Sequence, residues 1–168
     1  MNTVGEFLKE IEEATDTIWL EPPDELDNLK DPKGTYAHSF MNVNYLYHML
    51  RNLAGFLWML RQQAKGITAQ ASIPVKYLTS VAISTLDNYT GMIGLGGLTT
   101  TQGLLLKATD VLREIKKDAE TNDDQINAQN FVDVMDRLSV YINKMSSNGW
   151  LDILMKWPKI SCAYELME

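Results

Sequence analysis

The sequence has 168 residues, 45% of them hydrophobic, with 22 acidic and 15 basic side chains and a net charge of −7. This length fits one domain, and the hydrophobic fraction excludes a wholly disordered chain. A single cysteine, Cys162, excludes an internal disulfide and a zinc site made of cysteines. The net charge argues against general nucleic-acid binding. The first residues lack the basic and apolar regions of a secretory signal, so a cytoplasmic protein is expected.

The charge is distributed unevenly along the chain. Residues 1–31 hold ten acidic and two basic residues, a net charge of −8, whereas residues 32–109 hold one acidic and six basic residues, a net charge of +5. One interpretation is that the central helices are buried and the two ends are solvated. The alternative is that the central region presents a positive surface to an anionic ligand or an acidic partner.

The first predicted helix spans residues 3–19. Thr3 and Glu6 have the spacing of a capping box, and apolar residues then recur at helical intervals. Two prolines, at positions 22 and 23, end this helix because proline lacks an amide hydrogen and restricts the residue before it. The residues that follow, to about position 34, are predicted to form a loop.

The second predicted helix spans residues 35–65 and ends at Gly66, a residue typical of a helix C-terminus. Its central stretch, residues 45–60, is apolar around most of the helix, which is typical of a buried helix or a membrane span. This stretch is short for a span, and three polar residues interrupt it. We therefore predict a buried helix and no membrane span.

Further helices are predicted over residues 72–90, 100–119, 124–147 and 150–157. No alternating pattern predicts a strand. The predicted fold class is therefore all-α, a single domain over residues 1–168 with about five helices around the apolar second helix. Its parts include an acidic N-terminal helix and loop, residues 1–31, and an apolar C-terminal segment, residues 150–168.

Common catalytic and metal-binding motifs do not occur in the sequence. Residues 32–109 contain no glutamate, although di-iron helical bundles need paired glutamates and Glu-x-x-His motifs. The pair Asp123 and Asp124 resembles the start of a calcium loop but lacks its central glycine and final glutamate. We therefore predict that the chain is not an enzyme and holds no metal or cofactor.

The second helix carries a candidate ligand site. His48, Arg51 and Asn52 lie within about one turn of each other, and the planar guanidinium of Arg51 can hold a phosphate or a carboxylate. The alternative is that these side chains only mark the solvated side of the helix.

A glycine- and threonine-rich segment before the fourth long helix is the second half of this candidate site. Glycines let a backbone approach an anion, and a helix N-terminus offers unpaired amides. The predicted ligand-binding residues here are Gly94, Gly96, Gly97, Thr99 and Thr100. The alternative is a turn or a close helix contact that needs glycine for its own geometry.

The last part of the chain is rich in aromatic and apolar residues. Trp150, Leu154, Trp157 and Tyr164 are the predicted partner-binding residues, because aromatic side chains are enriched where proteins bind each other. The alternative is that this segment packs into the core of the protein.

The predicted function is a non-enzymatic helical protein-interaction module, as in a regulator, an inhibitor or an assembly subunit. Another protein is the expected partner, and homo-oligomers are expected as well. The alternative is a helical protein that binds a small anionic ligand, such as a nucleotide. A third hypothesis is that the acidic residues of 1–31 imitate the phosphates of a nucleic acid.

Overall fold

The computed structural model describes residues 3–17, 36–70, 75–95, 99–121 and 125–146. Its helices are α1 (Thr3–Thr17), α3 (Tyr36–Gln70), α4 (Val75–Leu95), α5 (Thr99–Thr121) and α6 (Gln125–Met145). In α3 the side chains are described from Tyr47 to Gly66. No strand occurs in these ranges, so the predicted all-α class is confirmed.

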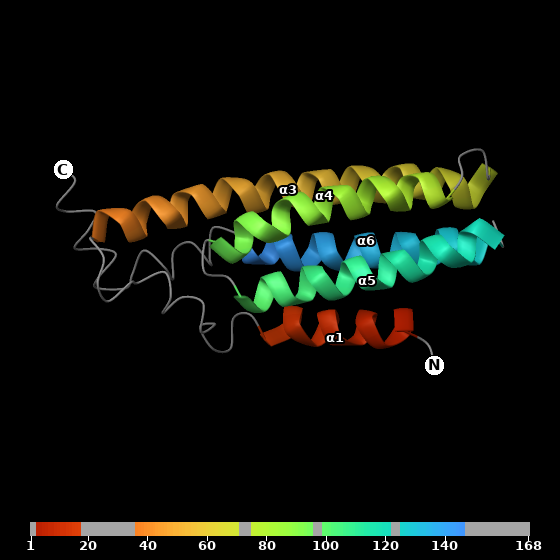
Figure 1. Cartoon of the computed structure of the whole chain (residues 1–168), viewed down its shortest axis with the longest axis horizontal. Coiled ribbons are helices and arrows are strands. Elements are labelled where there is room, and N and C mark those ends of the chain that lie inside the picture. The colour runs from red at the N-terminus through yellow and green to blue at the C-terminus, as the bar shows by residue number, and fades with distance from the viewer. Residues whose placement is uncertain (1–2, 18–35, 71–74, 96–98, 122–124, 147–168) are drawn as a thin grey trace.

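The helices run back and forth along one long axis (Figure 1). Each described helix is antiparallel to the one before it. From α3 to α6 the connections have only three or four residues, and such short connections favour antiparallel neighbours in helical bundles. The helices α3, α4, α5 and α6 form a four-helix bundle, and α1 lies along α5 and α6 on the side away from α3. As a result, α6 and α1 end at the same end of the bundle, where α3 begins.

The centre of the bundle is α6 rather than the second predicted helix. It packs against all four other helices, and its buried residues cover most of its circumference. By contrast, α3 packs chiefly on α6 and α4, and Trp58 and Met59 stay exposed on its outer side. Apolar residues around a helix therefore did not indicate full burial here, because some of them face outward.

One hydrophobic core joins the five described helices. Buried side chains come from every one of them, including Ile11, Leu57, Leu86, Leu112 and Phe131. A fully buried side chain of this kind contributes about 1.5–3 kcal/mol relative to an exposed one. The core, and not the polar contacts at the surface, therefore dominates the energy that holds the helices together.

The acidic first helix packs back on the bundle. Phe7 and Ile11 enter the core, and the Lys144 ammonium donates a hydrogen bond to the carbonyl of Thr15 over 2.7 Å. The carboxylate of Glu10 pairs with Lys107 of α5. Residues 1–31 therefore do not project as a whole; their described part, residues 3–17, lies against basic side chains of the bundle.

Two predicted helix ends differ from the structure because glycine did not stop the helix. We expected α3 to end at Gly66 and α4 at residue 90, but α3 continues to Gln70 and α4 to Leu95. Ile93 is fully buried in the core, so tertiary packing keeps the last turn of α4 helical despite its glycines. The predicted glycine loop therefore begins later, and Gly94 belongs to α4.

Candidate functional site

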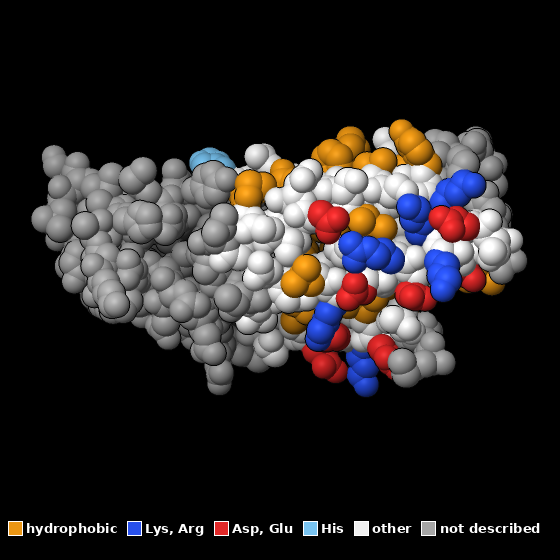
Figure 2. All heavy atoms as spheres, viewed as in Figure 1, with side chains coloured by type: hydrophobic (Ala, Val, Ile, Leu, Met, Phe, Trp, Pro, Cys, Tyr) orange, Lys and Arg blue, Asp and Glu red, His pale blue; other side chains and the backbone are white. Residues whose placement is uncertain are grey.

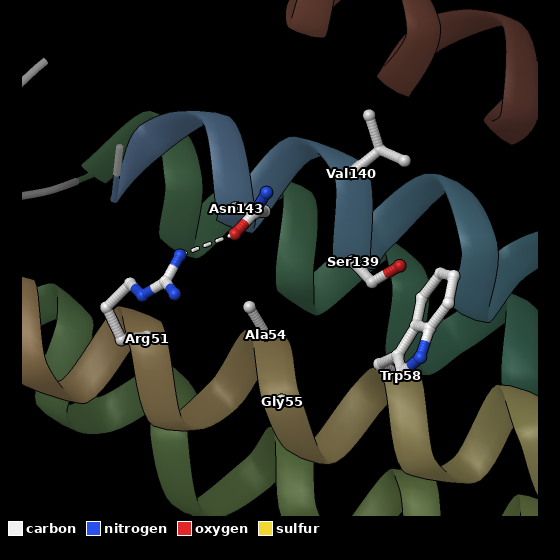
Figure 3. A pocket seen from close by; sticks show the side chains of 7 residues that line it. All are labelled: Arg51, Ala54, Gly55, Trp58, Ser139, Val140 and Asn143. Carbon is white, nitrogen blue, oxygen red and sulfur yellow. Dashed lines mark hydrogen bonds between the residues drawn. The ribbon is translucent and has the colours of Figure 1, made fainter. Parts of the chain in front are cut away.

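A groove runs between α3 and α6 on the outer surface of the bundle (Figure 3). Its volume is about 290 Å³. We call it the α3–α6 groove. It is lined by Arg51, Ala54, Gly55 and Trp58 of α3 and by Ser139, Val140 and Asn143 of α6. They recur three and four residues apart on each helix, so each set lies on one face.

Arg51 closes one end of the groove. Its guanidinium donates a hydrogen bond of 2.7 Å to the side-chain oxygen of Asn143, across the two helices (Figure 3). Ser139, deeper in the groove, donates its hydroxyl to the carbonyl of Asp136 over 2.9 Å. The polar groups at this end are therefore a guanidinium and an amide held against each other.

At the other end of the groove an exposed tryptophan is held by a charged pair. The Trp58 residue is 47% exposed, and the guanidinium of Arg61 lies 4.4 Å from its ring centre, in cation–π contact. Arg61 Nε lies 2.8 Å from Asp136 Oδ1, as an ion pair without the alignment of a hydrogen bond. The Arg61 side chain is only 15% exposed. Trp58 thus offers a large apolar surface to solvent, and the guanidinium beneath its ring belongs to Arg61, which is paired with Asp136.

Gly55 forms the open middle of the groove. A Cβ atom added there would meet nothing within 4 Å, so no internal contact of the described residues requires glycine at this position. Glycine within a helix costs about 0.5–1 kcal/mol relative to alanine. Because Gly55 has no side chain, the α3 backbone is exposed between Arg51 and Trp58.

The outer side of α3 carries no acidic residue. Its exposed residues from 48 to 66, called here the α3 face, are His48, Arg51, Asn52, Gly55, Trp58, Met59, Gln62, Gln63, Lys65 and Gly66. Elsewhere the surface carries many charges of both signs, over α5 and α1, whereas hydrophobic atoms gather along the edge formed by α3 and α4 (Figure 2). The α3 face therefore differs in composition from the α1–α5 side.

The predicted ligand-binding residues of α3 are only partly brought together. Arg51 lines the groove, but His48 and Asn52 do not. His48 is exposed and makes an edge contact with the ring of Tyr47, at 5.2 Å between centroids. Asn52 is exposed as well.

The predicted glycine–threonine half does not line the groove. At Gly94 the space that a side chain would need is taken by Gln102, whose Nε2 donates to the carbonyl of Thr90 over 3.3 Å. Thr100 is exposed at the start of α5, and Thr101 next to it is buried within 3.0 Å of the Tyr141 hydroxyl. Gly96, Gly97 and the side chain of Thr99 lie outside the described residues.

The two halves of the predicted site meet α6 on different sides. Thr101 contacts Tyr141, whereas Arg51 contacts Asn143. Tyr141 and Asn143 are two positions apart on α6, and residues two positions apart on a helix are separated by roughly 200° of rotation. A single ligand that touches both halves would have to pass around α6.

Of the residues that line the groove, sequence reasoning predicted only Arg51; it missed Trp58 and Asn143 among the others, and the pair Arg61 and Asp136 beside the groove. The apolar residues around Trp58 predict a buried helix, whereas Trp58 is exposed. A sequence signal existed for one contact, because Trp58 and Arg61 are three residues apart and share a helix face. The predicted partner-binding residues Trp150, Leu154, Trp157 and Tyr164 lie outside the described part of the chain.

Over the described ranges, His, Cys, Asp and Glu side chains form no group of three that could hold a metal ion. Among the same residues, none of the helices has the length and hydropathy needed to cross a membrane. Comparisons with protein families, with curated proteins and with solved structures found no match to this chain.

Proposed function

We propose that this chain is a non-enzymatic protein-interaction module that binds its partner through the α3–α6 groove and the adjoining α3 face. The observation that carries the proposal is the exposed Trp58 ring stacked on the partly buried guanidinium of Arg61. Tryptophan and arginine are the residues that most often dominate binding energy at protein interfaces. A ring already fixed in place loses little conformational freedom on binding.

The surface around Trp58 supports a protein partner. Interface centres are depleted of charged residues and enriched in aromatic residues, methionine and arginine. The α3 face has Trp58, Met59 and Arg51 and lacks acidic residues. An elongated groove between two helices suits an amphipathic helix, one of the recurrent modes of peptide recognition.

Regulator, inhibitor and assembly subunit are the roles that fit such a module. We also propose that the chain self-associates, because an exposed apolar face of one copy is available to another copy. The single cysteine supports a reducing compartment, and we propose the cytoplasm.

Site-specific photocrosslinking in the producing cells tests the partner-binding surface. A photoreactive amino acid replaces Trp58 in one variant and Leu106, an exposed residue of α5, in the matched control. We expect one discrete crosslinked protein from position 58 and not from position 106. The same adducts from both positions, or none from position 58, would overturn the proposal.

Light scattering over a range of concentrations tests self-association. We expect a mass above that of the monomer for the native chain and a lower mass for Trp58→Ala. A native chain that stays monomeric at high concentration would contradict self-association but not the binding of a different protein.

The second candidate function is binding of a small anion at Arg51. Arg51 and Asn143 converge at one end of a groove whose volume approaches the lower end of ligand pockets, about 300 Å³. Titration calorimetry with inorganic phosphate and with AMP tests it. Arg51→Ala should abolish the binding without lowering stability, whereas Lys76→Ala, which changes an exposed cation on α4, should preserve it. Equal binding by native chain and Arg51→Ala would exclude this site.

A further inference from the structure

Two opposite sides of the bundle carry opposite charge. On one side, α1 holds five acidic residues and one basic residue, a net charge of −4. On the other side, the described side chains of α3 and α4 include four basic residues and one acidic residue, a net charge of +3. Because α1 lies on the side away from α3, each molecule presents an acidic surface and a basic surface in opposite directions (Figure 1).

The carboxylates that α1 turns outward do not hold it on the bundle. Two others, Glu10 and Glu12, form the described ion pairs with α5 and α6. The outward set lies opposite the buried Phe7 and Ile11 on the helix, and no ion pair joins it to the described residues. These carboxylates are therefore available to another molecule. They are called here the α1 stripe and consist of Glu6, Glu13 and Asp16.

The α3 face has the complementary chemistry. It contains His48, Arg51 and Lys65 and no acidic residue. The guanidinium of Arg51 donates to Asn143 through one nitrogen and stays exposed, so it can also pair with a carboxylate. The indole N–H of Trp58 can only donate. Carboxylates only accept hydrogen bonds, so they match the polar groups of this face.

A second copy of this chain offers such carboxylates, but not on its own α3 face. Two α3 faces placed against each other would bring basic residues together without an acidic residue to pair with them, which disfavours a symmetric contact. The α1 stripe placed on the α3 face instead joins opposite charges. Since the net charge of −7 makes two copies repel each other in general, their relative orientation decides whether they attract.

We propose that the chain self-associates head to tail, with the α1 stripe of one copy seated on the α3–α6 groove and the α3 face of the next. The inference rests on the proposed function, because it names the two surfaces that the proposed self-association uses. A contact between two different surfaces leaves one of each free at the ends, so the assembly grows into a chain or closes into a ring. A copy seated there also competes with a different protein partner for Trp58.

Two variants of the full-length chain test the proposal, because each removes one of the two surfaces. The stripe variant carries Glu13→Lys and Asp16→Lys. Lysine near the C-terminal end of a helix interacts favourably with the helix dipole, so α1 should stay folded. The face variant carries Arg51→Ala and Trp58→Ala. Circular dichroism checks that both variants keep the helices of the native chain.

The control variant carries Asp118→Lys and Glu120→Lys. Both are exposed residues in the last turn of α5, at the other end of the bundle from Asp16 (Figure 1). The control and the stripe variant have the same net charge, and a general loss of repulsion would strengthen the association of both. We expect instead that the stripe variant alone associates more weakly than the native chain, by at least about tenfold in dissociation constant, because like charges then meet across the contact.

Mixing the two surface variants identifies a head-to-tail contact. In light scattering, each variant alone should stay monomeric at concentrations where the native chain associates. An equimolar mixture should form a dimer that grows no further, because each variant keeps the surface that the other lacks. A mixture that stays monomeric, or a stripe variant that associates as strongly as the native chain, would overturn the proposal.

The same measurements separate this inference from the proposed function. If the native chain and the stripe variant associate equally while the face variant does not, self-association through the α3 face stands and only the head-to-tail inference falls. If the native chain stays monomeric at high concentration, self-association and the inference fall together. A discrete partner crosslinked at position 58 would then still support the binding of a different protein.

Discussion

At the residue scale, a side chain at Gly55 is expected to change both the free energy of unfolding and the shape of the α3–α6 groove. Gly55→Ala should raise the free energy of unfolding by about 0.5–1 kcal/mol, because alanine favours the helix and its methyl group meets no neighbour. Urea denaturation followed by circular dichroism measures the change. Gly91→Ala is the control and should give a similar gain. Only Gly55→Ala should also lower partner capture at position 58, and a loss of stability at Gly55 would contradict the open space seen there.

The contact between Trp58 and Arg61 is measurable by a double-mutant cycle. Trp58→Leu and Arg61→Met, alone and together, should show a coupling of about 0.5–1 kcal/mol in the free energy of unfolding. Arg61→Lys keeps the positive charge beside Asp136 but lacks the flat guanidinium, so it should retain little of the coupling. A coupling near zero would show that Arg61 does not hold the indole in place.

At the element scale, the attachment of α1 depends on its apolar side chains. Ile11→Ala should lower the free energy of unfolding by about 2–5 kcal/mol, because Ile11 is fully buried between the helices. Glu10→Gln, which breaks the ion pair with Lys107, should change it by less than about 1 kcal/mol, since both side chains are exposed to solvent. Denaturation in urea distinguishes the two. A larger effect for Glu10→Gln would mean that charge, and not burial, fixes α1.

The helices themselves were largely predictable, whereas their ends were less so. Periodic apolar residues correctly indicated each of the five described helices. Gly66 was expected to end a helix and Gly94 to lie in a loop, but both lie inside helices. Local propensity could not reveal this, because the burial of Ile93 and the position of Gln102 against Gly94 depend on how α4 and α5 pack.

At the scale of the whole molecule, the site depends on contacts that sequence spacing does not encode. Arg51 was predicted as a binding residue, but its partner Asn143 lies 92 positions away. Asp136 is likewise 75 positions away from Arg61. The apolar sequence around Trp58 predicts a buried helix. Trp58 is exposed because α6, and not α3, lies at the centre of the bundle. Helical periodicity shows which residues share a face, whereas the neighbour of that face is decided by the packing of distant helices.

The shared core leads to a prediction about cooperativity. Phe131 of α6 is fully buried, and α6 packs against every other described helix. Phe131→Ala should lower the free energy of unfolding by about 3–5 kcal/mol while leaving a single transition, because one core joins the described helices. Circular dichroism reports the helices and tryptophan fluorescence reports local packing, so both should give the same midpoint in urea. Separate midpoints would show that some helices unfold independently, which would contradict the single domain predicted for residues 1–168.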